Sequence, residues 1–325
     1  MQSLVIVTAL ILSTVSGVLA QPVIRTPQEI YERFAATVVF IAATPEQGTG
    51  MGGTGSIIRP DGLVLTNAHV VVNSADHRPY SHISIFLKPE RVTGSPKTDL
   101  AERFTARVIA ANESLDLALL QIEQAPALRA IVFGDPATVR IGDPVLAIGH
   151  PEQGGMWTLT SGLISAEFED FNGTTGKHVF QTDTGLNRGN SGGPLLDSRG
   201  YMIGINTAMA RLAKDGTPIM SINFAVQSNV AQQWLKQYGI IIAYANPALD
   251  PLLTEHQAEV TSASPTLAAA PPPPPMKPVI AGAPQIKTAP HPYDLDEVLQ
   301  HTKQKQMKEM EDLLFEGREK MNRYR

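Results

Sequence analysis

Residues 188–196 read RGNSGGPLL and place one serine, Ser191, among three glycines and an asparagine. Glycine loses more conformational freedom on folding than any other residue, so Gly189, Gly192 and Gly193 indicate unusual backbone angles or the close approach of another group. Two interpretations fit this stretch: a tight turn that contains a serine, or a nucleophile whose own loop supplies N–H groups to an oxyanion. Residues elsewhere in the chain distinguish them.

A serine nucleophile needs a general base, and the base needs an orienting partner. His69, in TNAHVV, comes directly after the strand-like run Leu63–Thr66, where a side chain can face a cleft. Asp116, in SLDLALLQI, begins an apolar run and would be costly to bury without a fixed hydrogen-bond donor. Each also has a structural interpretation, His69 as a core histidine and Asp116 as a strand cap. Together with GNSGG, in the order His, Asp, Ser, they predict a catalytic triad with Ser191.

The order of these residues also separates two classes of serine hydrolase. In α/β-hydrolases a helix follows the G-x-S-x-G serine at once, and the triad histidine comes last in the chain. Here Gly192-Gly193-Pro194 breaks a helix, and the histidines beyond residue 250 fall in low-complexity sequence. The sequence therefore excludes that class. His150, in Gly149-His150-Pro151, is interpreted as a structural or surface histidine.

The composition narrows the remaining classes of protein. A net charge of −5, a pI near 5.9 and the absence of a Lys/Arg cluster argue against a partner made of nucleic acid. The chain has no cysteine, which excludes a cysteine nucleophile, thiolate metal sites and disulfides. No HExxH motif or other ligand cluster is present in the sequence. We therefore predict neither a metal nor a cofactor.

Short strand-like runs dominate the middle of the chain, separated by turn residues such as Pro60-Asp61-Gly62. Helices are expected only at the edges, after the capping box Thr26-Pro27-Gln28-Glu29 and over residues 229–238. This pattern predicts an all-β fold of antiparallel sandwiches or barrels. The expected strands are Thr37–Ile41, Ser56–Arg59, Leu63–Thr66, Ile83–Leu87, Thr105–Ala110, Leu117–Ile122, Pro144–Ile148, Leu159–Ala166, His178–Gln181, Met202–Asn206 and Ile222–Val226.

The first twenty residues, MQSLVIVTALILSTVSGVLA, carry no charged side chain. Val18-Leu19-Ala20 matches the small-x-small pattern of a signal-peptide cleavage site. This predicts a signal peptide over residues 1–20, a mature chain from Gln21, and export to the periplasm or the medium. The Lys or Arg that usually opens a signal peptide is missing, so a retained membrane anchor is the alternative.

The composition changes again beyond residue 240. Ten prolines between residues 265 and 292, five of them consecutive, predict a proline-rich linker over residues 241–292. Residues 293–325 carry opposite charges at i,i+4 spacing and predict a charged C-terminal helix. Gly317 interrupts the apolar seam of this helix, so a contact for self-association and a merely solvated helix both stay open. We expect the linker to separate this helix from the barrels.

Five segments, TNAHVV, SLDLALLQI, QTDTGLNRGNSGGPLL, IGINTAM and INFAVQS, together resemble the trypsin-like serine peptidases of the Deg (HtrA-like) family. The resemblance covers roughly residues 33–238. It implies a chymotrypsin-type double β-barrel with short flanking helices within a peptidase domain of residues 21–240. The two barrels would span roughly residues 33–125 and 126–226, with a closing helix at 229–238.

The resemblance also implies the role of each site residue. His69 would act as general base and then general acid, Asp116 would fix its tautomer, and Ser191 would form the acyl-enzyme. The backbone N–H groups of Gly189 and Ser191 would form the oxyanion hole. The substrates would be polypeptides, unfolded or damaged. A proteolytically silent chaperone or binding protein on the same fold is the alternative function, and self-association through the barrels or the C-terminal helix stays open.

The substrate pocket follows from the same resemblance. Its floor would lie six residues before the nucleophile, at Gly185, and its wall at Ile205, Asn206 and Thr207. An uncharged floor cannot compensate a buried lysine or arginine, so we predict cleavage after small or medium aliphatic residues such as valine, alanine or isoleucine.

Two features depart from the family pattern. Residues 240–325 offer too few strands for the PDZ domain that most members carry after the last helix. Asn190 is neutral where zymogen-type relatives carry an aspartate that pairs with a newly cut N-terminus. We therefore expect activity without a precise new N-terminus.

Overall fold

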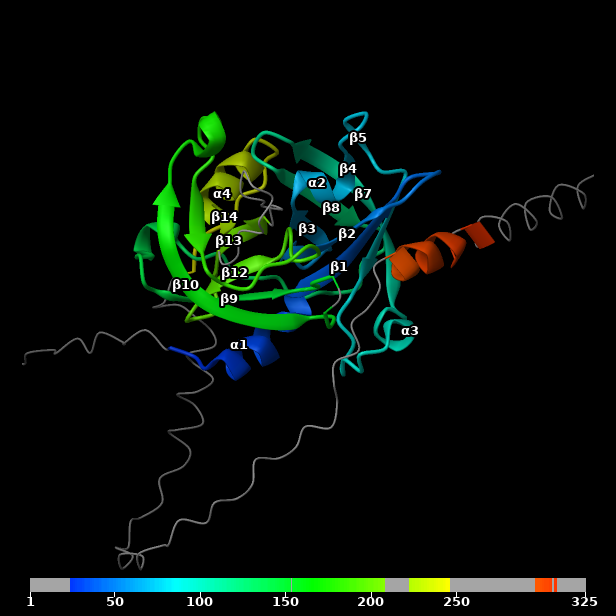
Figure 1. The fold of residues 1–325 in the computed structure, drawn as a ribbon, viewed down its shortest axis with the longest axis horizontal. Coiled ribbons are helices and arrows are strands. Elements are labelled where there is room, and N and C mark those ends of the chain that lie inside the picture. The colour runs from blue at the N-terminus through cyan, green and yellow to red at the C-terminus, as the bar shows by residue number, and fades with distance from the viewer. Residues whose placement is uncertain (1–23, 153, 208–221, 246–295, 306, 309–325) are drawn as a thin grey trace, which may run out of the picture.

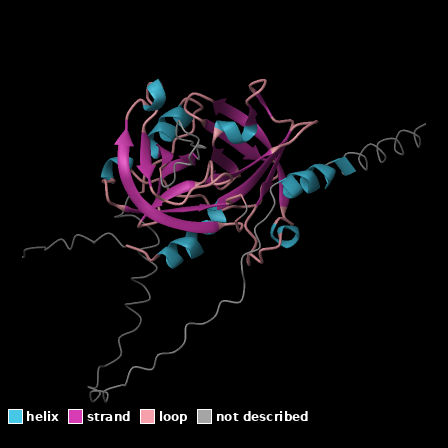
Figure 2. Cartoon of the chain, in the orientation of Figure 1, coloured by secondary structure: helices cyan, strands magenta, loops and turns pink. Residues whose placement is uncertain are grey.

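The computed structural model describes residues 24–152, 154–207, 222–245, 296–305 and 307–308. Strands are the main regular secondary structure of these residues and curve into two neighbouring sheets with short helices at the periphery (Figures 1 and 2). The predicted signal peptide and nearly all of the predicted linker lie outside the described residues, as does the end of the C-terminal helix. None of the helices within the described ranges has the length and hydropathy needed to cross a bilayer.

The first sheet is a closed barrel with the strand order β1-β2-β3-β8-β7-β6. Every pairing in it is antiparallel. The small strands β4 (Val72–Asn73) and β5 (Arg78–Pro79) form a separate two-stranded ribbon. The barrel strands are β1 (Val38–Thr44), β2 (Met51–Arg59), β3 (Leu63–Thr66), β6 (His82–Phe86), β7 (Arg103–Asn112) and β8 (Leu117–Ile122).

The second sheet is also a closed antiparallel barrel, with the order β10-β11-β14-β13-β12-β9. Two closed six-stranded barrels confirm the prediction of an all-β, chymotrypsin-type fold. The strands are β9 (Pro144–Gly149), β10 (Thr158–Phe168), β11 (Val179–Thr182), β12 (Pro194–Asp197), β13 (Met202–Thr207) and β14 (Asn223–Gln227).

Short helices flank the barrels. Besides the C-terminal helix described below, the α-helices are α1 (Pro27–Phe34), α2 (Ala68–Val71), α3 (Pro96–Asp99) and α4 (Ser228–Lys236), and the 3₁₀ turns are η1 (Ala35–Thr37), η2 (Pro136–Thr138) and η3 (Phe171–Gly173). The expected capping box is present at α1, where the Thr26 hydroxyl accepts from the Glu29 N–H and the Glu29 carboxylate accepts from the Thr26 N–H.

Alternating side chains of single strands enter two different cores. In β8, Ala118 and Leu120 belong to the interior of the first barrel, whereas Leu117 and Leu119 belong to a larger cluster shared with the second barrel and the helices. This follows from the two-residue period of a strand. Both faces of β8 are buried, so its sequence is a nearly continuous apolar run. The side chain of Trp157 also crosses between the barrels, because its Nε1–H donates to the Val38 carbonyl at 2.8 Å.

Two strands, β2 and β12, depart most from the sequence expectation. β2 starts at Met51, not Ser56, because Gly52-Gly53 looks like a turn and is in fact paired with β1. A Cβ at Gly53 would lie 2.5 Å from the Val70 side chain, so the glycine is needed where α2 approaches the strand. β12 was not expected, because its four residues follow the glycine loop directly. It forms by pairing with both β9 and β13.

The C-terminal helix packs against the first barrel instead of standing apart from it. Residues 296–305 and 307–308 are helical, and Val298 and Leu299 are buried in the same cluster as Phe86 at the end of β6. In Figure 1 this helix lies beside β7 and α3. The expectation that the linker separates this helix from the barrels is therefore wrong for the described part of the helix.

Candidate active site

Two neighbouring strands of the first barrel bring His69 and Asp116 together. His69 lies on α2, just after β3, and Asp116 lies in the turn before β8. Because β3 pairs with β8, the ends of the two strands are adjacent. The Nδ1 atom of His69 lies 2.9 Å from both carboxylate oxygens of Asp116, and the His69 backbone N–H donates to Oδ1 at 3.1 Å.

The backbone holds Asp116 in an uncommon conformation. Its φ angle is 60°, in the left-handed region that few residues other than glycine adopt. The side-chain amide of Asn67, the residue that precedes α2, donates to the Asp116 carbonyl at 2.8 Å. Asn67, which lies two residues before His69, thus holds the turn in place, and the turn directs the Asp116 carboxylate toward His69.

A third donor to the carboxylate comes from the second barrel. The Thr207 hydroxyl, at the end of β13, donates to Asp116 Oδ2 at 2.9 Å. Burial acts to raise the pKa of the Asp116 carboxyl, but the hydrogen bonds and charge of His69, with the Thr207 bond, outweigh it and hold the pKa below its usual value. The carboxylate is therefore ionised at neutral pH.

An ionised carboxylate decides the tautomer of His69. It can only accept hydrogen bonds, so the proton must be on Nδ1 and the Nε2 lone pair is available as a base. The His69 side chain is 40% exposed, whereas that of Asp116 is 14% exposed. The pair therefore presents a basic nitrogen outward from a shielded carboxylate, which is the arrangement of a general base and its orienting group.

Ser191 lies in the loop before β12, and backbone hydrogen bonds anchor this loop on both barrels. The Gly192 N–H donates to the Asn206 carbonyl on β13, and the Thr54 N–H on β2 donates to the Ser191 carbonyl, each at 2.8 Å. A Cβ at Gly192 would lie 2.1 Å from the Thr66 hydroxyl, so the loop passes directly beside the segment that leads into α2 and His69.

Gly189 has contacts that only glycine permits. Its φ angle is +94°, and a Cβ there would lie 2.0 Å from the His150 carbonyl oxygen. The Thr54 hydroxyl donates to the Gly189 carbonyl at 2.6 Å, and the Glu152 N–H donates to the Arg188 carbonyl at 2.6 Å. Within the described part of the chain, the Gly189 N–H donates no hydrogen bond. In this loop the carbonyls of Arg188 and Gly189 are therefore hydrogen-bonded, while the Gly189 N–H is available to a ligand.

His150 is fully buried beneath this loop, and its Nδ1 lies 3.0 Å from the Thr54 hydroxyl oxygen. Because that hydroxyl donates to Gly189, the Nδ1–H of His150 must donate to the hydroxyl oxygen. Burial lowers the pKa of His150 to about 3. The ring packs edge-on against Trp157, with 4.7 Å between centroids. The residue is structural, as the sequence suggested, but its place under the loop gave no sequence signal.

The four expected pocket residues lie in different environments. Gly185 is exposed and close to Thr160, while Ile205 is fully buried in the cluster between the barrels. Asn206 is also buried, and its side-chain amide donates to the Pro194 carbonyl at 2.8 Å. The Thr207 side chain contacts the carboxylate of Asp116. The pocket itself stays a prediction, whereas the contact of Thr207 with Asp116 was not foreseen.

Within the described ranges, no group of three or more histidine, cysteine, aspartate or glutamate side chains is placed to bind a metal ion.

The chain is similar to known proteases in sequence and in fold. The model of the trypsin-like peptidase domain family matches residues 53–205. The magnetosome formation protease MamE of Paramagnetospirillum magneticum is 39% identical over 185 residues, which is 56% of this chain and 23% of that protein. The periplasmic pH-dependent serine endoprotease DegQ of Escherichia coli is 37% identical over 214 residues, which is 66% of this chain and 42% of that protein.

Among solved structures, the HtrA-type protease AlgW with tripeptide matches with a TM-score of 0.54 and 30% identity, over 66% of this chain and 63% of that chain. The chain thus spans less than half the length of both curated relatives. The family model's match contains the His69, Asp116 and Ser191 segments and the complete strands from β3 to β12, whereas β1 and β14 lie outside it. The protein therefore carries a trypsin-like peptidase domain that is homologous to DegQ and MamE and similar in structure to the HtrA-type protease AlgW.

Proposed function

We propose that the protein is a serine endopeptidase that cleaves unfolded or damaged polypeptides through an acyl-enzyme. The observation that carries this proposal is the contact between His69 and Asp116. The Nδ1 atom of His69 lies 2.9 Å from both carboxylate oxygens, and the Thr207 hydroxyl is a third donor to the carboxylate. A silent binding protein needs no such arrangement, because it does not have to stabilise a transient imidazolium.

In the acylation step, the Ser191 Oγ attacks the substrate carbonyl carbon while its proton passes to His69 Nε2. The charge that forms on the imidazolium is stabilised by Asp116. The substrate oxygen becomes an oxyanion that accepts hydrogen bonds from the N–H groups of Gly189 and Ser191, each worth about 3–4 kcal/mol in comparable sites. His69 then gives its proton to the leaving amine as the C–N bond breaks.

Deacylation repeats these steps with water. His69 removes a proton from the water molecule as its oxygen attacks the acyl carbon, and the second oxyanion uses the same N–H groups. The Ser191–acyl bond then breaks, and His69 returns the proton to Ser191 Oγ. No proton is transferred to Asp116 at any stage, in keeping with a carboxyl pKa below its usual value.

The names of the similar proteins support the proposed class of substrate and the proposed cellular compartment. DegQ is named a periplasmic serine endoprotease, and AlgW has been solved with a tripeptide. We infer that this protein likewise acts on polypeptides after export to the periplasm or the medium. Gly185 would form the uncharged floor of the pocket, which favours cleavage after valine, alanine or isoleucine.

Digestion of a permanently unfolded protein tests the proposal, with the cut sites mapped by mass spectrometry. We expect cuts after aliphatic residues by the wild type and none by Ser191→Ala, whose circular dichroism spectrum should be unchanged. A dominant preference for lysine or arginine would overturn the pocket assignment. Binding of the unfolded protein without cleavage by the wild type would favour the silent chaperone.

A further inference from the structure

Lys177 of the second barrel contacts the turn that carries Asp116. Its Nζ atom donates a hydrogen bond to the Ser114 carbonyl at 3.1 Å. Ser114 lies between β7 and β8 of the first barrel, two residues before Asp116, whereas Lys177 lies in the connection from β10 to β11 of the second. The contact therefore joins the two barrels beside the candidate active site, and the mechanism proposed above does not use it.

The turn needs support from outside. The φ angle of 60° at Asp116 is one that side chains other than glycine rarely adopt, and such a conformation persists only where the surrounding structure fixes it. Within the turn, the Asp116 N–H donates to the Glu113 carbonyl at 3.2 Å. From outside, Asn67 binds the Asp116 carbonyl and Lys177 binds the Ser114 carbonyl. The turn is thus held at both of these points by side chains from other elements.

Hydrogen bonds also fix the loop that carries Lys177. The Lys177 N–H donates to the Thr174 carbonyl at 3.1 Å, and the Phe171 N–H donates to the Lys177 carbonyl at 2.8 Å. The Gly176 N–H donates to the Asp170 carboxylate at 2.7 Å. The backbone of Lys177 is therefore bonded on both sides, and its side chain extends from a defined point.

This loop is attached to the same part of the second barrel as Thr207. The ring of Phe171 packs against that of Phe224 on β14, with 4.5 Å between centroids. Phe224 lies opposite Thr207 in the pairing of β14 with β13. Two donors of the second barrel thus approach Asp116 from connected elements: the Thr207 hydroxyl binds the carboxylate, and the Lys177 ammonium binds the backbone of the turn.

The ammonium of Lys177 is in an unfavourable place for a charge. Its side chain is half-buried, and burial lowers its pKa, while the Asp116 carboxylate acts in the opposite direction. A lysine whose only role is solubility usually extends its charged end into water. The position of this ammonium, bonded to the turn and within the field of the carboxylate, is instead that of a group with a local role at Asp116.

We propose that Lys177 is a positioning residue for Asp116. By holding the Ser114 carbonyl, it keeps the turn in the conformation that aligns the Asp116 carboxylate with Nδ1 of His69. This inference rests on the proposed function, because an oriented base is needed only if His69 takes part in a reaction. In that mechanism Lys177 contacts neither the substrate nor the reacting atoms, and it acts through Asp116.

Two substitutions at Lys177 separate positioning from stability. Lys177→Met keeps most of the length of the side chain but removes the donor and the charge, whereas Lys177→Arg keeps both. We expect kcat to fall by about fivefold in Lys177→Met with little change in KM, and Lys177→Arg to retain most of the activity. The melting temperature of Lys177→Met should not fall, because burial disfavours the ammonium and water can reach the exposed Ser114. A merely structural role would lower the melting temperature instead.

The proton resonance of His69 Nδ1–H tests the proposal without substrate. It is recorded on the full chain with ¹⁵N-labelled histidine and assigned by its absence from His69→Gln. A hydrogen bond to a carboxylate moves this resonance downfield and slows its exchange with water. We expect it to move upfield or broaden in Lys177→Met and to keep its wild-type position in Lys177→Arg.

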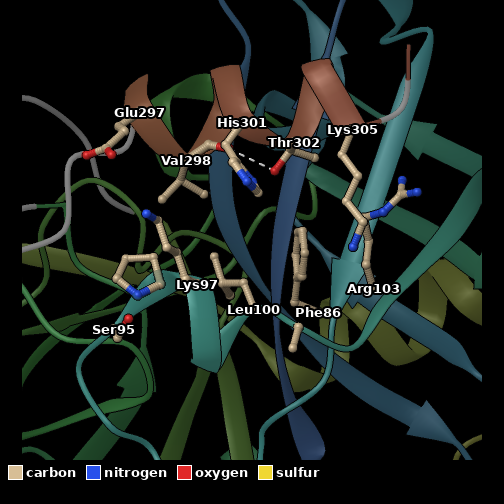
Figure 3. Close-up of a pocket in the computed structure, with 12 residues that line it drawn as sticks. Phe86, Ser95, Lys97, Leu100, Arg103, Glu297, Val298, His301, Thr302 and Lys305 are labelled. Atoms are coloured by element: carbon tan, nitrogen blue, oxygen red, sulfur yellow. Dashed lines mark hydrogen bonds between the residues drawn. The ribbon is translucent and has the colours of Figure 1, made fainter. Parts of the chain in front are cut away.

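Lys97→Met is the matched control, because it removes the same charge far from the triad. Lys97 lies on α3 and lines a cavity of about 490 Å³ beneath the C-terminal helix, whose lining includes no residue of the candidate active site (Figure 3). This variant should have the wild-type resonance and the wild-type kcat.

The proposal is overturned if the resonance is the same in Lys177→Met and Lys97→Met, or if an active enzyme has the same kcat in both. It is also overturned if Lys177→Arg is as impaired as Lys177→Met. The resonance needs no turnover, so it decides the role of Lys177 even in a protein that cleaves nothing. A wild type without peptidase activity whose resonance still responds to Lys177→Met would refute the proposed function and leave the positioning of Asp116 in place.

Discussion

The hydroxyl of Thr54 donates a hydrogen bond of 2.6 Å to the carbonyl oxygen of Gly189. Thr54 lies on β2 of the first barrel, whereas Gly189 precedes the candidate nucleophile in the second. The Thr54 N–H also donates to the Ser191 carbonyl, so one residue holds this loop at two points. The position of the proposed oxyanion hole therefore depends on how the two barrels are joined.

Replacing Thr54 should lower activity through this hydrogen bond. Thr54→Val keeps the shape of the side chain but leaves the Gly189 carbonyl and the His150 Nδ1–H without their partner, which should cost about 1–3 kcal/mol of stability. We expect kcat to fall by about tenfold or more with little change in KM, because the loop acts on the oxyanion and not on substrate binding. Thr54→Ser keeps the hydroxyl and should retain most of the activity. Steady-state kinetics on a peptide substrate test this. Equal kcat values for the valine and serine variants would contradict it.

The carboxylate of Asp116 should be essential, and Thr207 should support it. Asp116→Asn places an amide beside His69 and should reduce turnover by about four orders of magnitude, as in other triads. Thr207→Val removes one hydrogen bond to the carboxylate and should reduce kcat by about tenfold, since bonds to charged groups contribute about 1.5–3 kcal/mol. Thr207→Ser is the control. If Thr207→Val is as active as Thr207→Ser, the contact has no part in catalysis.

Stability should fall as the pH drops below the usual pKa of histidine, because of His150. Its pKa in the folded state is about 3, whereas a histidine in the unfolded chain has a pKa near 6.5. Between these values the unfolded chain binds a proton that the folded chain does not. The free energy of unfolding should therefore decrease on acidification by up to about 1.4 kcal/mol per pH unit.

Urea denaturation between pH 6.5 and 5 measures this dependence. His150→Asn should be less stable at neutral pH and should show a flatter dependence over that range. The other ionisable groups are common to both proteins, including His77, whose pKa is raised by the hydrogen bond that its Nδ1–H donates to the Glu113 carboxylate. Their contributions cancel in the difference. Parallel curves for the two proteins would show that His150 becomes protonated in the folded state.

Removing the tail should affect stability more than catalysis. A chain cut after residue 245 loses the contacts of Val298 and Leu299 with the first barrel and exposes Phe86. Re-exposed apolar side chains cost about 1.5–3 kcal/mol each, so the melting temperature should fall. Hydrolysis of a small peptide should continue at nearly the full rate below that temperature. A truncated protein that melts normally but is inactive would place part of the tail in the active site.

Some parts of the fold and site follow from the sequence alone, and others do not. His69, Asp116 and Ser191 could be proposed from the sequence because each stands beside a recognisable strand or glycine loop, and their order selects one class of hydrolase; their catalytic roles stay a prediction. Thr54 carries no comparable signal, since a threonine in a strand is ordinary and its partner lies 135 residues away. Contacts between the two barrels arise only when both have folded.

The position of the C-terminal helix was beyond prediction for a related reason. Its charged pairs and the proline-rich sequence before it are typical of a solvated helix on a linker. Only three residues of its described part, Val298, Leu299 and Thr302, are buried. With so few buried residues, the periodicity of apolar residues in the sequence is too weak to show that the helix packs, or against which surface it packs.

Reaction with a fluorophosphonate tests the central claim most directly. The reagent labels a serine only when a base activates it and an oxyanion hole receives the developing charge. We predict one adduct per chain, located by tandem mass spectrometry on Ser191, and no adduct in Ser191→Ala or His69→Ala. A folded wild-type protein that stays unlabelled, or that is labelled on another residue, would contradict the assignment of Ser191 as the nucleophile.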